Sequence, residues 1–371
     1  MPSLPITLDA ALRDARSPDP NARNLAVRHL PAALLAELGE VPPGLHVAAG
    51  HPRGEAVVAA LTAALDDPVV ALRALAATGL AQLGEPDVIP RIDPWLADPD
   101  PGPDAGHLRE CAAITCVLLG LAAAPEHLLK PTDEDDDPTR PVEAPASAAH
   151  PLRPPGHVPS DLSRVTYEAA LARITAALRA PAADLRFQAA GGLVELAGRA
   201  AEPALCAALE GEPHPRVRFA LVQALAELDP PGPEACVRLA AVVADPAADA
   251  DLAFAAALGL AAARDPRGGP PLVLALARAD DRGRALEALA ALGPAAPPAA
   301  VPLALKIARG WFIPAVTRVR AAYALVRMAP ATGQPLFDEL ARSRRPAVQE
   351  AVADARAGLA LLTLKDMSKK T

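Results

Sequence analysis

One pattern of residue types recurs along most of this 371-residue chain, at intervals of a little over thirty residues. In its clearest copy, residues 214–228, Pro215 suits the first turn of a helix because its φ is already helical and its missing N–H would have no partner there. Val217, Leu221 and Leu225 follow at helical spacing and form one apolar face. A repeat of this length predicts stacked pairs of helices, in which each pair packs on its neighbours.

An arginine marks the same position in most copies. The register of Arg218 returns at Arg73, Arg109, Arg186, Asp251, Arg282 and Arg318, with a weaker copy at Arg23. From Arg186 onward the intervals are 32, 33, 31 and 36 residues. A second amphipathic stretch lies between copies, for example over 169–178, so each unit is predicted to be a helical pair. We interpret the six arginines other than Arg23 as structural, pairing with a carboxylate of a neighbouring unit.

The details of each copy resemble a known family. An Asp-Pro or His-Pro dipeptide precedes the helix, an arginine follows an apolar residue, and a small residue such as Gly79 or Gly192 stands two turns later. This pattern resembles HEAT repeats, especially the short type found in bilin lyases and many bacterial proteins. The resemblance covers nearly the whole chain except about 130–160. It implies an all-α solenoid, a right-handed superhelix of about eight or nine helical hairpins, and leaves the function open.

Composition agrees with a helical solenoid built from small side chains. Hydrophobic residues make up 51% of the chain but aromatic residues only 2%, so Ala, Leu and Val must form the core. Almost no segment alternates β-branched and polar residues as a strand would. The 43 prolines cluster at turns between helices, where they act as helix boundaries rather than as a sign of disorder.

The repeats predict four segments. Residues 1–129 hold N-terminal repeats with an enlarged loop over 39–52, and 161–362 continue the same solenoid before a basic tail at 363–371. Residues 130–160 are acidic and proline-rich, with too few apolar side chains to offset the entropy of ordering, so we expect disorder. The acidic run Asp133–Asp137 is compatible with a solvated loop, a binding segment for a basic partner or a weak divalent-cation site. It could also fold onto the basic end of the chain and block it.

Net charge, cysteine pattern and targeting signals limit the kinds of partner and the cellular location that we expect. A net charge of −8 argues against a general nucleic-acid or anionic-membrane surface, because such surfaces neutralise phosphates. The four cysteines lie at apolar-compatible helical positions without a CxxC pair, which favours buried, reduced thiols. The start of the chain lacks the pattern of a secretory signal, and no uncharged, proline-free apolar run is long enough to span a bilayer. We therefore expect a cytoplasmic, bacterial protein whose oligomeric state stays open.

The second helix of each pair should line the inner groove of the superhelix. Phe187 and Phe219 share one groove register, together with Leu252 and Val319, and Tyr323 occupies a neighbouring register. Because aromatic residues are scarce here, this apolar stripe is a candidate site for a partner's helix or extended peptide. The alternative is that these side chains tuck between adjacent pairs as ordinary core.

The C-terminal part of this acidic chain is basic. Residues 301–345 hold eight Lys and Arg residues against only Asp338 and Glu339. Trp311 and Tyr323 lie among them, and Arg320 and Arg327 are candidates for selecting acidic groups. An acidic peptide, a phosphorylated partner or nucleic acid could bind here through charge-assisted hydrogen bonds. The alternative is a solvated surface.

Enzymatic functions find less support in the residues. Members of the HEAT-repeat family that hydroxylate a lysine derivative use His-Glu dipeptides as iron ligands, and the chain has none. HEAT-like DNA glycosylases need a basic groove with a catalytic Asp, and no catalytic residue of bilin lyases can be matched. No common catalytic motif occurs, so no catalytic residue, metal site or cofactor is predicted. We predict a non-enzymatic scaffold for an unidentified protein partner, with a bilin-lyase-like chromophore-binding enzyme or, less favoured, a nucleic-acid-binding protein as alternatives.

Overall fold

The computed structural model describes residues 7–39, 44–124 and 161–368, and the side chains up to residue 357. Within these ranges the chain forms α-helices and short 3-10 turns and no β-strand, so the predicted all-α class is confirmed. The acidic insertion predicted at 130–160 lies outside the described residues. Contacts divide the chain into two compact units, 1–201 and 202–371, and each is described by itself. The four predicted segments stay a prediction.

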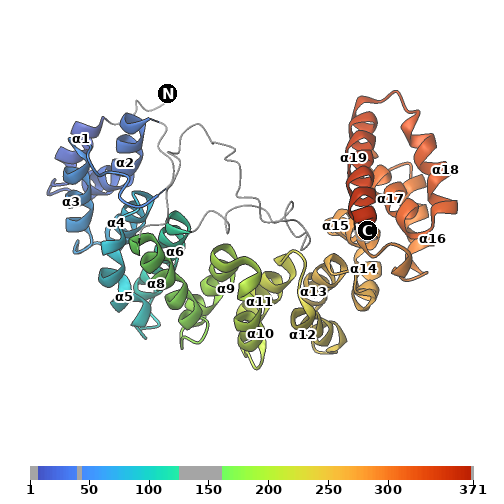
Figure 1. Cartoon of the computed structure of the whole chain (residues 1–371), viewed down its shortest axis with the longest axis horizontal. Helices are drawn as coiled ribbons and strands as arrows, with labels where there is room; N and C mark the ends of the chain where they lie inside the picture. Colours follow the sequence, from blue (N-terminus) through green and yellow to red (C-terminus); the bar gives the residue numbers. More distant parts are fainter. Residues whose placement is uncertain (1–6, 40–43, 125–160, 369–371) are drawn as a thin grey trace, which may run out of the picture. The chain divides into compact units, whose positions relative to one another are not determined.

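The described residues of unit 1 form four antiparallel helical pairs (Figure 1). Each pair has a first helix, a short link and a second helix, and the second helices α2, α4, α6 and α9 contact one another in that order. The pairs are α1 (Leu8–Asp14) with α2 (Pro20–Leu38), α3 (Gly54–Ala64) with α4 (Val70–Gln82), α5 (Ile89–Ala97) with α6 (Pro103–Ala123), and α8 (Asp161–Ala177) with α9 (Ala183–Ala197).

Unit 2 repeats the arrangement with five pairs, and its second helices α11, α13, α15, α17 and α19 again contact one another in order. The nine pairs of the described ranges agree with the eight or nine hairpins expected. The pairs are α10 (Glu202–Leu209) with α11 (Pro215–Glu227), α12 (Pro233–Ala244) with α13 (Ala250–Ala262), α14 (Gly269–Ala275) with α15 (Arg282–Leu292), α16 (Ala300–Arg309) with α17 (Ala315–Met328), and α18 (Pro330–Ala341) with α19 (Pro346–Ser368).

Glycine allows the second helices of unit 1 to approach closely. A Cβ atom added at Gly192 on α9 would lie 2.6 Å from Cγ2 of Val117 on α6, and one added at Gly120 would lie 2.4 Å from Cδ2 of Leu196. Side chains at these positions would push the helices apart. The small residue expected two turns into each copy therefore has a packing role here, since interiors tolerate little overpacking.

The helix α6 is long and apolar enough to cross a membrane by length and composition alone, with a mean hydropathy of 1.3. Its packing explains this composition, because α6 contacts α4, α5, α8 and α9, and 61% of its apolar window is buried. A helix enclosed on most sides by other helices is expected to be apolar nearly all round.

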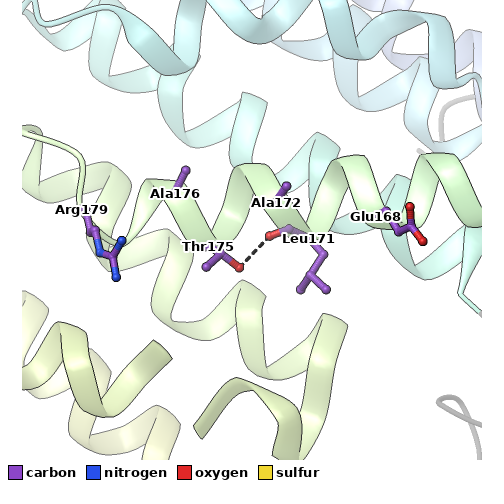
Figure 2. Close-up of a pocket in the computed structure, with 6 residues that line it drawn as sticks. All are labelled: Glu168, Leu171, Ala172, Thr175, Ala176 and Arg179. Carbon is purple, nitrogen blue, oxygen red and sulfur yellow. Dashed lines mark hydrogen bonds between the residues drawn. The ribbon is translucent and has the colours of Figure 1, made fainter. Parts of the chain in front are cut away.

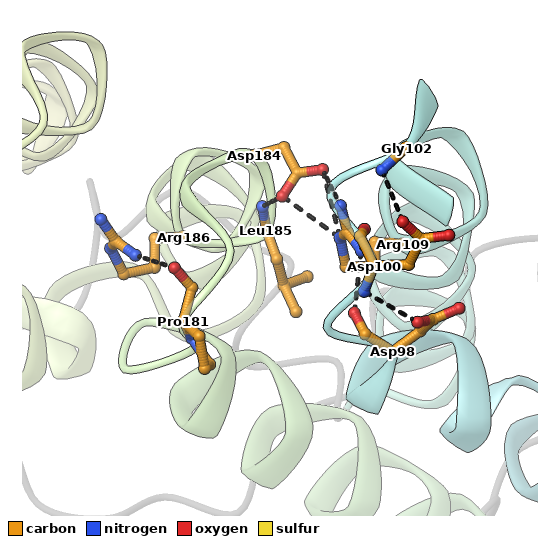
Figure 3. A network of polar contacts seen from close by, with 8 residues as sticks. All are labelled: Asp98, Asp100, Gly102, Arg109, Pro181, Asp184, Leu185 and Arg186. Carbon is orange, nitrogen blue, oxygen red and sulfur yellow. Dashed lines mark hydrogen bonds and ion pairs between the residues drawn. The ribbon is translucent and has the colours of Figure 1, made fainter. Parts of the chain in front are cut away.

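Arg109 on α6 connects two pairs that are far apart in sequence (Figure 3). Its Nη1 donates to the carbonyls of Asp98 and Asp100, at 2.8 and 2.7 Å, in the link between α5 and α6. Its Nη2 donates to Oδ2 of Asp184 on α9, at 2.8 Å. Arg109 is only 3% exposed, so these bonds offset the cost of burying its charge.

Other arginines of the repeat bind carbonyls in the same way. Arg186 donates to the carbonyls of Ala180 and Pro181, at 2.8 and 2.9 Å, and Arg282 donates to that of Leu276 at 2.8 Å. In each case the acceptors lie in the link of the arginine's own pair. Carbonyls at the end of a helix lack intrahelical donors, so the guanidinium supplies the missing hydrogen bonds and closes the link.

The remaining repeat arginines differ in their contacts. Arg218 pairs with Asp245 in the next link at 2.7 Å, and Arg318 donates to the carbonyl of Ala308 at 3.0 Å. Nε of Arg73 is buried without a hydrogen-bond partner among the described residues. The contacts thus vary from copy to copy around a shared position.

Candidate partner-docking surface

The most exposed aromatic side chains of the described residues stand next to each other in unit 2. Trp311 is 83% exposed and Phe312 is 95% exposed. Both belong to residues 310–314, which join α16 to α17 and which we call the aromatic link. The sequence analysis named Trp311 but missed Phe312, because nothing in the local pattern distinguishes an aromatic side chain that packs inward from one that points to solvent.

Backbone contacts fix the shape of the aromatic link. The Gly310 N–H donates to the Ile307 carbonyl at 3.1 Å, and the Ile313 N–H donates to the Gly310 carbonyl at 3.3 Å. Ile313 packs against the core of unit 2, and Arg318 ties α17 to the last turn of α16. The link is therefore anchored at both ends, while the two aromatic side chains between the anchors remain in solvent.

Exposed cations adjoin the aromatic link. Lys306 and Arg309 lie in the last turn of α16, where a positive charge also suits the helix dipole. Both are exposed and form no ion pair with the described residues. Leu303, 39% exposed, lies one turn before Lys306 on the same face, and Val316, 41% exposed, lies in the first turn of α17. The surface around the link thus combines apolar and basic side chains.

No carboxylate occurs in the sequence between Glu287 and Asp338. Five cations occur in that stretch, and they are Lys306, Arg309, Arg318, Arg320 and Arg327. Only one of them, Arg320, pairs with a carboxylate of the described residues, at 3.1 Å from Oε1 of Glu287. This part of unit 2 therefore carries an excess of positive charge within an acidic chain.

The other C-terminal candidates lie on α17. Tyr323 is half-buried against the core, and burial raises the pKa of its hydroxyl although the nearby Arg327 acts in the opposite direction. Nε of Arg327 is buried without a hydrogen-bond partner among the described residues. Arg320 is half-exposed and bound to Glu287 on α15, which reduces its availability for an acidic partner.

Phe219 on α11 is 37% exposed, so it is accessible on the second-helix face of unit 2. Phe187 on α9 belongs to unit 1 and is partly exposed. Leu252 was expected to share their register, but it is only 6% exposed and lies in the core position. Leu252 corresponds to the core residue Val217 of α11. Phe254, two residues after Leu252, corresponds to Phe219.

The reason for this correction is the helix register. Asp251 is the second residue of α13, whereas Arg218 is the fourth residue of α11. Aligning Asp251 with Arg218 therefore compares each residue of α13 with a residue of α11 that lies two positions further from the start of its helix. Phe254 is 4% exposed and lies under the guanidinium groups of Arg278 and Arg284, with their Cζ atoms 5.3 and 5.7 Å from the ring centre. The same register can therefore hold a core side chain.

Val319 on α17, the other residue expected in this register, is also core at 1% exposed. It is part of the apolar cluster that joins α17 to α19. Phe254 and Val319 therefore pack as core side chains between adjacent pairs, which was the alternative considered for this register. Phe219 remains accessible.

A shallow depression of about 480 Å³ lies along α8 in unit 1 (Figure 2). Alanine and threonine side chains form its floor, between Glu168 and Arg179. The Thr175 hydroxyl donates to the Leu171 carbonyl at 2.8 Å, so its proton is already engaged. All lining residues except Arg179, which follows the end of α8, lie on that one helix. The depression is open, unlike the enclosed clefts that usually hold small molecules.

The cysteines are unsuited to nucleophilic chemistry. All four are free thiols, and Cys111, Cys116 and Cys206 are buried while Cys236 is partly exposed. Burial raises the pKa of Cys111 to about 11, of Cys116 to about 12 and of Cys206 to about 11. Because the thiolate is the reactive form, these side chains are poor nucleophiles at neutral pH. No group of three or more metal-ligating side chains gathers within the described residues.

Comparison with known proteins supports the repeat. Residues 171–261 match the family model described as HEAT repeats. A comparison with curated proteins finds no match. Similar solved structures include Kap95p, with 12% identity, a TM-score of 0.47, and coverage of 95% of this chain and 52% of that one.

Two further structures show the same level of likeness. Kap121p has 13% identity and a TM-score of 0.39, over 96% of this chain and 45% of its own. The complex of CpcE and CpcF of phycocyanin lyase from Nostoc sp. PCC7120 has 21% identity and a TM-score of 0.32, over 91% and 96%. The chain spans about half the length of Kap95p and Kap121p, and none of these likenesses carries an argument about what it binds. Residues 171–261 thus match HEAT repeats, and helical pairs of the same form lie on both sides of the matched residues.

Proposed function

We propose that this chain is a non-enzymatic scaffold that binds a protein partner, and that the aromatic link of unit 2 is a docking point for that partner. The observation that carries the proposal is the exposure of Trp311 and Phe312, at 83% and 95%. The chain has only nine aromatic residues, so two adjacent ones in solvent are unusual. Buried aromatic side chains dominate the energetics of protein interfaces, and contiguous exposed apolar patches mark such sites.

The anchoring of the link supports the same proposal. Because hydrogen bonds and the packing of Ile313 already order this segment, a partner would not have to provide the free energy of ordering it. Leu303 on α16 and Val316 on α17 are further exposed apolar side chains in the helices that flank the link. The buried thiols and the open depression on α8 offer little to a catalytic function, so binding fits the described residues better than chemistry does.

The proposal can be tested by affinity capture from the source organism's soluble extract. The double variant Trp311→Ala, Phe312→Ala should lose a protein that the unchanged chain retains. Leu162→Ala, Leu274→Ala is the matched control, because both side chains are exposed, at 44% and 76%, and neither lies in the aromatic link. Equal capture by all three baits, with unchanged helical content, would show that the aromatic link is not a docking point.

A further inference from the structure

We infer that the partner segment docking at the aromatic link is an acidic peptide, in which carboxylates flank an apolar side chain. This inference rests on the proposed function and adds the chemistry of the ligand. The local surface has two parts that such a peptide would satisfy together. Trp311 and Phe312 offer apolar area, and the adjacent turn of α16 offers the charges of Lys306 and Arg309.

Charge complementarity selects the acidic peptide. Lys306 and Arg309 have no ion-pair partner among the described residues, and no carboxylate lies in the sequence between Glu287 and Asp338. Other arginines of the same unit do have a local counter-charge, as Arg218 has in Asp245 and Arg238 has in Glu210. A ligand with carboxylates would supply the missing counter-charges, and hydrogen bonds between charged groups are stronger than neutral ones.

Position on the chain also suits a short linear segment. Lys306 precedes Arg309 by one helical turn, and Trp311 and Phe312 follow directly at the end of α16. The exposed cations and aromatic residues thus follow one another within residues 306–312, where a peptide could contact both in turn. Leu303, one further turn away, would extend the same contact.

Other ligands with negative charge fit this surface less well. Two unpaired cations beside the link provide only about 1 kcal/mol each near an anionic bilayer, and the chain as a whole is acidic. Single-stranded nucleic acid is held by a basic groove that tracks the backbone together with successive stacking platforms. A local pair of cations beside a pair of aromatic rings matches a few carboxylates and one apolar side chain.

Trp311 can report binding directly. The chain has two tryptophans, and the other, Trp95, lies in unit 1, so Trp95→Phe leaves a single fluorescent reporter in the aromatic link. In this background the probe is a synthetic peptide that alternates glutamate with leucine, and its control carries glutamine in place of glutamate. We expect the acidic peptide to shift the Trp311 emission to shorter wavelength, and the glutamine peptide to bind roughly tenfold more weakly.

Variants separate charge from apolar contact. Lys306→Gln, Arg309→Gln should weaken acidic-peptide binding roughly tenfold or more, and added salt should weaken binding to the unchanged surface. Arg179→Gln, Arg199→Gln is the matched control, since both arginines are exposed in unit 1 without a partner among the described residues, and it should leave binding unchanged. Circular dichroism checks that each variant keeps its helical content.

The outcomes distinguish this inference from the proposed function. If the glutamine peptide binds equally well, or if Lys306→Gln, Arg309→Gln has no effect, the acidic ligand is wrong while partner docking at Trp311 and Phe312 still stands. A response to an oligothymidylate or to phosphatidylserine vesicles, but not to the peptide, also overturns the inference, as does a shift that follows self-association in sedimentation. If affinity capture does not depend on Trp311 and Phe312, the proposed function itself fails.

Discussion

Arg109 and Asp184 lie 75 residues apart in the sequence and form an ion pair with Nη2 and Oδ2 at 2.8 Å. The pair joins α6 to the start of α9, on opposite sides of the stretch 125–160. The helix α6 packs against both helices of the next described pair, α8 and α9.

Removing one member of this pair should destabilise unit 1. The Arg109 side chain is 4% exposed, and Arg109→Ala removes the donor of two link carbonyls and the counter-charge of Asp184. Hydrogen bonds that involve a charged group contribute about 1.5–3 kcal/mol each, so the loss should be of at least that size. Asp184→Asn should cost less, because the Asp184 side chain is 40% exposed. Urea unfolding of each variant measures the change. Arg13→Ala, which removes an exposed pair with Asp14, is the control and should unfold like the unchanged chain.

A matched pair of glycines tests the close approach of α6 and α9. Gly192→Ala places a Cβ 2.6 Å from Cγ2 of Val117, and overpacking of this kind costs about 1–3 kcal/mol. The neighbouring Gly191 has nothing within 4 Å of its added Cβ, so Gly191→Ala should stabilise the helix by up to about 1 kcal/mol. Thermal unfolding of the two variants should shift in opposite directions. A shift in the same direction would show that this contact is not tight in solution.

Acid should weaken unit 2 through Asp245. The Arg218 guanidinium and the Ala247 N–H donate to this carboxylate and hold its pKa below the ordinary value of 3.8. A carboxyl whose pKa is lower in the folded state stabilises folding above the unfolded pKa, and the contribution is lost as the pH falls through the folded pKa. Asp245→Asn should therefore unfold more easily than the unchanged chain at neutral pH. The difference should shrink as the pH falls below about 4, in the window where the carboxylate becomes protonated. Urea midpoints at several pH values measure it, and Arg218→Gln should show the same trend.

Phe219 and Phe254 occupy the same register but differ in exposure, at 37% and 4%. Phe254→Ala should destabilise unit 2 by about 3–5 kcal/mol, as large-to-small changes in a core do. Phe219→Ala should change stability much less, because part of its surface already faces water. If the second-helix face also contacts the partner, as the sequence analysis suggested for Phe187 and Phe219, then Phe219→Ala should reduce capture while the unfolding midpoint stays nearly constant.

The sequence predicted the helical pairs closely. The copy expected over 214–228 contains α11, and the amphipathic stretch expected over 169–178 lies almost entirely in α8. These boundaries can be read locally, because proline in a first turn and small apolar residues at helical spacing act within one or two turns. The predicted fold class depends on such local signals and is confirmed.

Register and exposure could not be read in the same way. Counting arginines assigned Leu252 to the surface, but α13 begins at a different distance from its acidic residue than α11 does from Arg218. Whether an aromatic side chain in this register is covered depends on the next helical pair, which lies about thirty residues further along the chain. Arg278 and Arg284 cover Phe254, and no local pattern around Phe254 indicates that.

The sequence by itself therefore determined that this chain forms pairs of helices and that positive charge collects near its C-terminal part. Only the tertiary structure decided that Arg109 meets Asp184 across 75 residues, that Phe254 and Val319 are core, and that Phe312 stands in solvent beside Trp311. The physical reason is that helix formation and capping are local, whereas burial and ion pairing depend on segments that only packing brings together.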